Sequence, residues 1–530
     1  MCSNKIRPLQ AYTAICSNTN QANSWEESAK YLLDALIIDD DHIGETVDQI
    51  LLRTANYQIR DIEDPPPFTE EEVTELLHTL RKGKAPGLGG IDTYMIQGSW
   101  PELGTIFTDL ANACLSTGTF PQRWKHGKII AILKSKDRND SEPSSYRPIC
   151  LLPVLGKLLE KLIKQRIEPL TTDMFAYQYG FRKGISTTDV IIRLKNLVSG
   201  TSEKYAFGIF ADIKGAFDRV WWPDVRSKLR DVRCPPNLYG LIESYLSDRK
   251  VTIIDNTEHL TKVQNRGCPQ GSVLGPIFWN LVFDSLLDEL SNLGNCSPNA
   301  YADDLVLLIR GNTRKQLETY AQGALQVLDR WCRDHKMLLS TDKTVGPMLK
   351  GRLDDERPPI LRMASGPLKF CKTVKYLGIM IDKQFRFTSH TKYVAEKAKI
   401  IMYKYAAMCG LKWGVSYREM LTIYRGSFVP IINYAAYAWI DNVNSVSLRK
   451  IISAHRCALI RVTKAYRTTS THALEVISNV APIAHELQLE KLRYCIRKAI
   501  PCNIYGTIYE TRDQNPKNLI ENVKADLKII

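Results

Sequence analysis

The chain lacks the features that mark membrane-spanning, secreted and disulfide-stabilised proteins. No run of eighteen apolar residues occurs among its 530 residues, so the sequence predicts no transmembrane helix. The N-terminus has no apolar signal core, and we therefore expect a protein of the nucleus and cytoplasm rather than a secreted one. The thirteen cysteines include no C-x2-C pair, which favours reduced thiols over disulfides. No histidine follows Cys495 and Cys502 at zinc-knuckle spacing, which argues against zinc there.

Internal repeats and low-complexity tracts are also absent, and the 44% hydrophobic content is that of a folded protein. The formal net charge of +14 is unevenly distributed along the chain. Residues 26–75 hold fifteen acidic and three basic side chains, whereas residues 76–530 hold 66 basic and 42 acidic ones. A basic body of this kind favours a polyanionic partner such as nucleic acid. A basic surface that serves only solubility is the alternative.

The most informative feature present is an Asp-Asp pair, Asp303 and Asp304, between two apolar runs. The run from Leu305 to Ile309 predicts a buried strand, so the pair would lie at the bend of a hairpin. Adjacent anions repel, and burial would disfavour both charges unless a divalent cation relieved the cost. Phosphoryl-transfer sites often hold pairs of Mg²⁺ with carboxylates. A solvated β-turn is the alternative.

A second apolar run, residues 205–212, predicts another strand that ends in a carboxylate, Asp212. A two-metal site needs a further carboxylate on a neighbouring strand, and Asp212 is suited to that role, with Asp218 beyond the turn. Five residues after Asp212, the ring of Phe217 would press on the sugar of an incoming nucleotide. It would thereby exclude a 2′-hydroxyl and select deoxynucleotides. A core aromatic at a strand-to-helix junction is the alternative.

A third motif, residues 265–276, contains Pro-Gln-Gly, which cannot continue a strand or a helix. Gly271 would let the backbone approach a bound base or sugar closely, and Gln270 can donate and accept hydrogen bonds at once. The apolar spacing after Pro276 predicts a helix packed beneath the site. An ordinary turn before a helix is the alternative.

Three further helices are predicted from local patterns. Thr69 would be the N-cap of a helix in which Glu72 completes a capping box. Apolar residues between 317 and 331 fall on one helical face, which we interpret as core. Between His390 and Arg425 seven basic residues accompany two acidic ones around an apolar stripe at 394–405, which predicts a basic amphipathic helix. A merely solvated face is the alternative for that last helix.

The three motifs, in this order, resemble motifs A, B and C of reverse transcriptases. Residues 145–161 and 178–188 resemble the fingers of non-LTR retrotransposon enzymes, and residues 328–344 and 376–379 look like motifs D and E. The run Ala-Tyr-Arg-Thr-Thr-Ser at 465–470 resembles the type-1 retrotransposable elements of arthropods. The resemblance covers roughly residues 80 to 490. One departure is Gly89, which stands where the family usually has Asp.

The resemblance implies an α+β right-hand polymerase with fingers, a palm of antiparallel sheet backed by helices, and a helical thumb. We expect four regions: an acidic N-terminal connector (1–80), fingers and palm (81–385, with the reverse transcriptase core at about 117–385), a basic helical thumb (386–470) and a truncated C-terminal helical region (471–530). The family carries an endonuclease before the polymerase, and its residues are not recognisable here. We therefore expect this chain to be a fragment of a larger polyprotein.

The implied activity is RNA-directed DNA polymerase, used during target-primed insertion of the element. Its implied partners are an RNA template, a DNA primer or target, and dNTPs, with no membrane; the oligomeric state stays open. Two Mg²⁺ ions, with Mn²⁺ as an alternative, would be held by Asp212, the Ile213 carbonyl, Asp303 and Asp304. The remaining implied roles are proton donation to pyrophosphate (Lys343), nucleotide binding (Phe217, Gln270, Gly271, Arg182, Lys183) and primer or template contact (Tyr301, Leu377, Gly378, Lys392, Lys397, Lys399, Lys404, Lys412).

The same residues leave three alternative functions open. A viral-type RNA-dependent RNA polymerase would need a polar group near Phe217, where the chain has an aromatic ring. An intron-encoded maturase is disfavoured by the run at 465–470. A catalytically decayed nucleic-acid-binding remnant is consistent with Gly89, although the intact carboxylates argue against it.

Overall fold

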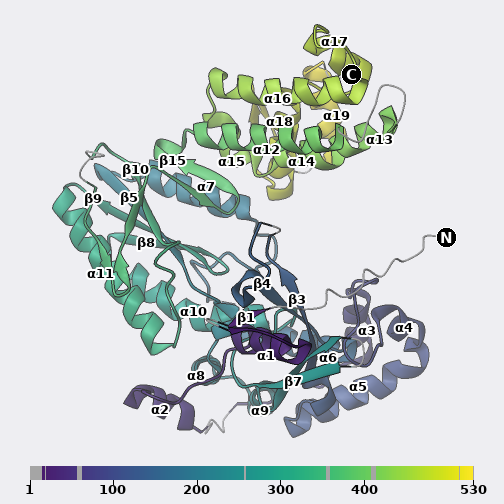
Figure 1. Cartoon of the computed structure of the whole chain (residues 1–530), viewed down its shortest axis with the longest axis vertical. Coiled ribbons are helices and arrows are strands. Elements are labelled where there is room, and N and C mark those ends of the chain that lie inside the picture. Colours follow the sequence, from purple (N-terminus) through teal and green to yellow (C-terminus); the bar gives the residue numbers. More distant parts are fainter. Residues whose placement is uncertain are drawn as a thin grey trace. The chain divides into compact units, whose positions relative to one another are not determined.

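The computed structural model describes residues 15–17, 20–56, 62–135, 137–172, 174–255, 258–353, 358–406, 414–512 and 514–528. The chain divides into two compact units that interleave along the sequence. The first unit comprises Met1–Arg182, Asp212–Leu293 and Ala324–Ser340, and the second comprises Lys183–Ala211, Gly294–Gly323 and Thr341–Ile530. Both units mix helices and sheets, which confirms the predicted α+β class (Figure 1). No helix in the described ranges is long and apolar enough to cross a membrane.

The first unit contains a four-stranded sheet in the order β4-β3-β6-β7. Its strands are β3 (His126–Leu133), β4 (Tyr146–Leu151), β6 (Arg249–Asp255) and β7 (Glu258–Gln264). The strand β3 pairs antiparallel with β4 and parallel with β6, and β6 and β7 form an antiparallel hairpin. The side chains of β3 alternate between buried and accessible positions, as expected for a sheet with one covered face.

The cover on that face comes from the N-terminal segment, which also forms β1 (Cys16–Ser17), β2 (Asn20–Gln21) and α2 (Val47–Thr54). The helix α1 (Trp25–Leu36) begins at the N-cap Ser24 and buries Ala29, Leu32, Leu33 and Leu36 along one side. These side chains share one apolar core with strand residues such as Ile129 and Val251. Residues from the predicted N-terminal connector therefore form part of the sheet's hydrophobic core.

The remaining helices of the first unit include two that the sequence predicted, the helix capped by Thr69 and the helix expected after Pro276. They are α3 (Glu70–His78), α4 (Thr93–Gly98), α5 (Trp100–Thr117), α6 (Val154–Ile167), α8 (Trp222–Asp231), α9 (Pro236–Leu246) and α10 (Gly275–Ser291). Thr69 is the N-cap of α3, as predicted. The predicted capping box is wrong, because the Glu72 carboxylate accepts hydrogen bonds from Arg166 at 2.6 and 2.9 Å instead. The helix α10 is buried along most of its length, as expected for a helix beneath a site.

The second unit contains a five-stranded sheet in the order β13-β10-β5-β9-β8. Its strands are β5 (Tyr205–Asp212), β8 (Cys296–Tyr301), β9 (Asp304–Gly311), β10 (Val345–Lys350) and β13 (Lys369–Cys371). Central strands with both faces covered read as continuous apolar runs, and residues 305–309 of β9 are all buried. The helix α7 (Thr187–Ser199) packs on β8. The helix α11 (Arg314–Asp334), whose residues are divided between the two units at Ala324, has the predicted apolar face, with Leu317, Ala321, Ala324 and Leu328 buried.

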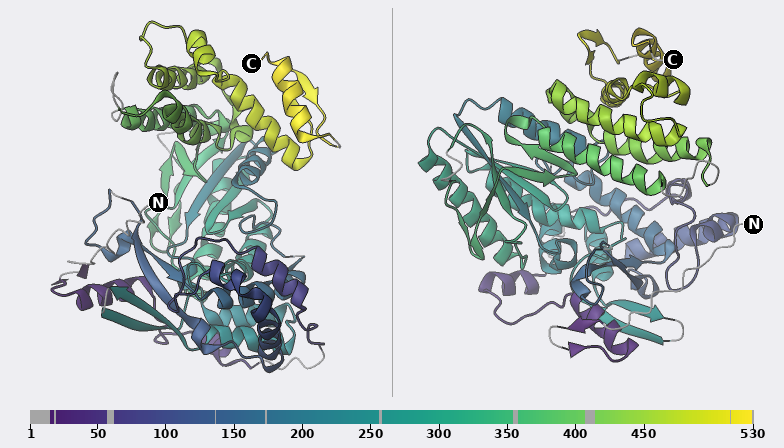
Figure 2. Two further views of the ribbon diagram at one scale, coloured as in Figure 1. Left: turned by 90° about the vertical axis from the view of Figure 1, so that its right-hand side faces the viewer. Right: turned by 45° about the horizontal axis from the view of Figure 1, so that its top comes forward.

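The C-terminal part of the second unit is mainly helical and begins after the hairpin of β14 (Thr373–Tyr376) and β15 (Ile379–Asp382). Its helices are α12 (Thr388–Ala406), α13 (Tyr417–Ile423), α14 (Val429–Asn433), α15 (Ala436–Trp439), α16 (Ser445–Thr463), α17 (Thr471–Ser478), α18 (Ile483–Lys498) and α19 (Pro516–Asp526). The helices α12 and α16 lie side by side (Figure 2). Short strand pairs β11 (Arg362–Met363) with β12 (Gly366–Pro367) and β16 (Cys502–Ile504) with β17 (Thr507–Tyr509) complete the unit. None of the eleven cysteines in the described ranges forms a disulfide.

Candidate active site

The Asp-Asp pair lies at the turn of the antiparallel hairpin formed by β8 and β9, as predicted. Tyr301 faces Asp304 across the hairpin, and Ala302 adopts a positive φ of 58° that closes the turn. Asp303 is half-buried and Asp304 is exposed. The expectation that burial disfavours both charges is therefore wrong for Asp304, because this residue is exposed at the start of β9. The mutual repulsion of adjacent carboxylates remains as the reason for a cation there.

Asp212 is the last residue of β5, the strand that is hydrogen-bonded to β9 in the sheet order. Its backbone carbonyl accepts a hydrogen bond from the Ser340 amide at 2.8 Å, and Ile213 forms a bridge with Leu339. The Ile213 side chain is buried, which leaves only its carbonyl as a ligand candidate. The three carboxylates and one carbonyl are all oxygen donors, the ligand type that Mg²⁺ prefers. Within the described ranges, no group of three or more His, Cys, Asp or Glu residues is arranged so that it could hold a metal ion.

Phe217 begins a short 3₁₀ helix (Phe217–Arg219) that follows β5. Its ring is half-buried and lies 5.7 Å from the ring centroids of both Phe181 and Trp279. The ring is therefore held by other aromatic rings on two sides while part of its surface stays accessible. This arrangement fixes the position of the ring, as a steric selector requires, and it also accounts for an aromatic residue here through packing alone.

The Pro-Gln-Gly loop is fastened to two neighbouring segments of the first unit. The Gln270 side chain donates a hydrogen bond from Nε2 to the Asp218 carboxylate at 2.9 Å. The backbone carbonyl of Gln270 accepts a hydrogen bond from the Cys150 amide at 2.8 Å. Gly271 has a φ of 121°, and a Cβ atom there would lie 2.7 Å from the Cys150 carbonyl oxygen. The close approach that Gly271 permits is thus to the chain's own β4, whereas the sequence suggested a bound base or sugar.

Glu160 is a residue of this region that the sequence analysis missed. Its carboxylate is buried within α6 and accepts hydrogen bonds from the amides of Val273 and Leu274 at 2.6 and 3.2 Å. These amides lie just before the first residue of α10, where the helix dipole favours a negative charge. Burial raises the pKa of the Glu160 carboxyl above its ordinary value. A lone Glu among buried apolar positions of one helix was the available signal, but its partners lie more than 110 residues away.

The three basic residues predicted to act on the phosphates, Arg182, Lys183 and Lys343, differ in their surroundings. The Arg182 guanidinium donates to the backbone carbonyls of Phe175 and Gln178 at 2.8 and 3.2 Å, so it also fixes its own loop. Lys183 is exposed shortly before α7, and Lys343 is exposed between α11 and β10. Their proposed roles toward a triphosphate or pyrophosphate stay predictions.

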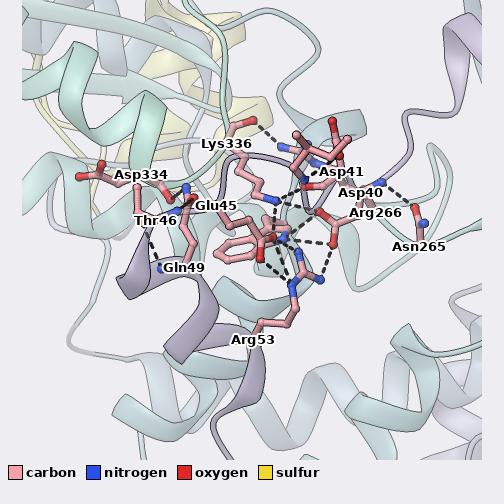
Figure 3. A network of polar contacts seen from close by, with 12 residues as sticks. Asp40, Asp41, Glu45, Thr46, Gln49, Arg53, Asn265, Arg266, Asp334 and Lys336 are labelled. Atoms are coloured by element: carbon pink, nitrogen blue, oxygen red, sulfur yellow. Dashed lines mark hydrogen bonds and ion pairs between the residues drawn. The ribbon is translucent and has the colours of Figure 1, made fainter.

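A network of ionic and polar contacts joins the N-terminal segment to residues that flank motifs A, B and D (Figure 3). Arg53 on α2 pairs with Asp40 at 2.7 Å and with Glu45, and Lys336 pairs with the same two carboxylates at 3.3 and 2.6 Å. The Trp221 indole donates to Asp40 at 3.1 Å. Hydrogen bonds from Arg53 hold the pKa of Glu45 down at about 2. These contacts therefore hold the N-terminal segment against Trp221, which follows motif A, and Lys336, which lies in motif D.

Leu377 and Gly378, which were predicted to contact the primer or template, form the turn between β14 and β15. Both have positive φ angles, 45° and 81°. The Tyr434 hydroxyl donates to the Leu377 carbonyl at 3.0 Å, and a Cβ on Gly378 would lie 3.0 Å from the Tyr434 ring. Thr187 shares a hydrogen bond of 2.9 Å with the same hydroxyl. The turn is therefore held in one conformation by Tyr434.

The predicted basic amphipathic helix is α12. Its residues Val394, Ala398 and Met402 are buried, which confirms the apolar stripe, although the structure adds Met402 and leaves Ile401 and Tyr405 only half-buried. The lysines of this helix project from its other faces: Lys392, Lys397 and Lys404 are exposed and Lys399 is half-buried. Lys412, also predicted to contact nucleic acid, lies outside the described residues.

Comparison with known proteins supports the resemblance. A family model for "Reverse transcriptase (RNA-dependent DNA polymerase)" matches residues 132–381. The 115 kDa protein in type-1 retrotransposable element R1DM of Drosophila melanogaster is 33% identical over 448 residues, 84% of this chain and 43% of that protein. The Pol polyprotein from type-1 retrotransposable element R1 of Nasonia vitripennis is 30% identical over 230 residues, 42% of this chain and 68% of the relative. A telomerase structure from Candida albicans is 12% identical, with a TM-score of 0.40 over 74% of this chain and 69% of that one.

The α+β fold, the ordered motifs and the family match define a reverse transcriptase domain. The chain belongs to the Pol proteins of non-LTR retrotransposons that include the type-1 elements of arthropods. It spans less than half the length of the Drosophila relative.

Proposed function

We propose that the chain is an RNA-directed DNA polymerase that copies retrotransposon RNA into DNA. The observation that supports it best is the sheet order of the second unit: β5, which Asp212 ends, is the hydrogen-bonded neighbour of β9, which begins at the Asp303–Asp304 turn. Neighbouring strands that end or begin in carboxylates are what a two-metal nucleotidyl-transfer site requires. The exposure of Asp304 leaves it open to an ion and a triphosphate.

Each candidate site residue would have its own role in nucleotidyl transfer. Asp212, Asp303, Asp304 and the Ile213 carbonyl would hold two Mg²⁺ ions, which activate the primer hydroxyl and neutralise the triphosphate when bound. The Phe217 ring would lie against the deoxyribose and exclude a 2′-hydroxyl. Gln270 would orient the nucleotide. Lys343 would donate a proton to departing pyrophosphate, and Arg182 and Lys183 would contact phosphate oxygens. The RNA template, the DNA primer, target-primed insertion and a location in the nucleus and cytoplasm belong to the same proposal.

A decayed remnant that binds nucleic acid without catalysis is the second candidate, and Gly89 is the observation behind it. A Cβ placed on Gly89 would meet no atom within 4 Å, so the substitution by Gly neither fills nor opens a packed space. The altered position is therefore compatible with an intact fold, which favours the active enzyme.

Primer extension on an RNA template tests the proposal. The wild-type chain should incorporate dNTPs in the presence of Mg²⁺, and Asp303→Asn should lose nearly all incorporation while binding primer–template almost as before, because catalysis and phosphate contacts are separable. Asp109→Asn, at an exposed position of α5, is the matched control and should keep full activity. Incorporation by Asp303→Asn at the wild-type rate would show that the metal assignment is wrong. A wild-type chain that binds but never extends would favour the remnant.

A further inference from the structure

The loop between α16 and α17 contains the run Ala-Tyr-Arg-Thr-Thr-Ser at 465–470, which the proposed chemistry does not use (Figure 1). Its aromatic residue, Tyr466, is 86% exposed, which is far more than most tyrosines of a folded protein. An aromatic ring left in solvent costs free energy, because apolar surface stays in contact with water. Such a position suggests that the ring contacts something outside the chain.

The loop that presents this ring is held in place by a fork of hydrogen bonds from one half-buried arginine. Arg456 on α16 donates from Nη2 to the Arg467 carbonyl at 2.6 Å and from Nη1 to the Thr469 carbonyl at 2.6 Å. The Thr469 amide in turn donates to the Tyr466 carbonyl at 3.1 Å, which closes a turn behind the ring. The backbone of Tyr466 is therefore ordered before any ligand arrives, which lowers the entropic cost of binding.

The surroundings of the loop are strongly basic. The helix α16 has four Lys or Arg residues and no acidic one, and the loop adds Lys464 and Arg467. A second exposed ring lies on the neighbouring helix: Tyr403 of α12 is 51% exposed, and the Arg461 guanidinium stacks over it at 3.6 Å. Basic side chains and accessible aromatic rings thus alternate over the packed helices α12 and α16 and over the loop that follows α16. This combination is typical of surfaces that bind single-stranded nucleic acid.

We propose that the loop at 464–470 is a stacking platform for unpaired bases of single-stranded RNA, with Tyr466 as the ring and Lys464 and Arg467 as phosphate contacts. The choice of RNA rests on the proposed function, in which the chain must hold a template far longer than the segment at the active site. Unpaired bases, rather than a duplex, are the ligand because only unstacked bases offer a free face to an exposed ring.

Binding is measured by fluorescence anisotropy with a labelled single-stranded RNA, the matching single-stranded DNA and an RNA duplex, without nucleotides. Tyr466→Ala should weaken binding of single-stranded RNA about tenfold, the effect expected when one stacked base is lost. Tyr466→Trp should restore binding because indole has a larger face, whereas Tyr466→Leu should not, because it is apolar but has no aromatic face. Tyr505→Ala is the matched control: Tyr505 is 61% exposed on another turn of the same unit, and its loss should leave binding unchanged.

Charge removal provides a second measurement on the same loop. The double variant Lys464→Gln and Arg467→Gln should reduce the salt dependence of single-stranded RNA binding by about 1.4 in log–log slope, since each contact contributes about 0.7. Equal losses on RNA and on single-stranded DNA still support stacking, because every base has an aromatic face. Loss on DNA alone, equal loss on the duplex, or rescue by Leu would overturn the proposal. None of these measurements uses polymerase activity, so their failure is distinct from a failure of the proposed function.

Discussion

The Gln270 amide donates to the Asp218 carboxylate at 2.9 Å, which ties motif B to the end of motif A. A carboxylate can only accept hydrogen bonds, so it selects the amide nitrogen of Gln270 and turns the amide oxygen the other way. Asp218 would thereby decide which group Gln270 presents to a nucleotide. Its role is to position Gln270.

Asp218→Asn tests this relationship. The new amide can donate as well as accept, so the orientation of Gln270 is no longer fixed. We expect the KM for dNTP to rise about tenfold, equivalent to about 1.4 kcal/mol, with a smaller fall in kcat. Steady-state kinetics on a primed RNA template give both constants. A double-mutant cycle with Gln270→Ala should show strong coupling, and additive effects would mean that Asp218 acts through other contacts.

Sugar selection is predicted to depend on the Phe217 ring. Phe217→Val shortens the side chain and should admit ribonucleotides, because the proposed block is steric. The measurement is the ratio of dNTP to rNTP incorporation efficiency, with Phe181→Val as the control that disturbs the same ring cluster. If the ratio stays unchanged in Phe217→Val, or changes equally in both variants, the residue serves aromatic packing instead.

The pH dependence of stability should report the N-terminal network. Because Arg53 lowers the pKa of Glu45 to about 2, this carboxylate stabilises the fold above its unfolded pKa of 4.5, and the contribution disappears as the pH falls from 4.5 through 2. Glu45→Gln should lower the free energy of unfolding by about 1 to 2 kcal/mol at pH 7 and by much less near pH 2.

Denaturant unfolding at several pH values measures this difference. Asp48→Asn is the control, since Asp48 is an exposed acid on the same segment and should change stability little at any pH. A Glu45→Gln deficit that stays constant down to pH 2 would contradict the ionic origin of the contribution.

Much of the fold was predictable because local apolar patterns dominate it. The strands β5 and β9 and the helices α10 and α11 occur where continuous or periodic apolar runs predicted them. Their burial follows from the sequence spacing alone, and the turn of the β8–β9 hairpin follows from the break between two such runs.

The contacts that fasten the site could not be predicted, because they join residues far apart in the chain. Glu160 reaches the start of α10, Gly271 lies against Cys150, and Glu72 pairs with Arg166 in place of its own helix end. The local rule for a capping box was valid, but the half-buried Arg166 side chain competed for the same carboxylate. A single sequence contains no signal for such partners.

The last prediction concerns the lysines of α12, which are proposed to contact the phosphates of the primer–template duplex. Lys392 and Lys404 are both exposed on a helix whose other side is buried, so replacing them removes charge without removing packing. The double variant Lys392→Gln and Lys404→Gln should reduce the log–log salt slope of duplex binding by up to about two and shorten the products, because each phosphate contact contributes about 0.9. The single-turnover rate should change little, since the charges lie on a different element from the carboxylates. Lys30→Gln with Lys517→Gln removes the same charge from exposed positions elsewhere and should leave the slope intact. A lower single-turnover rate with an unchanged salt slope would mean that α12 supports the palm structurally and does not bind the duplex.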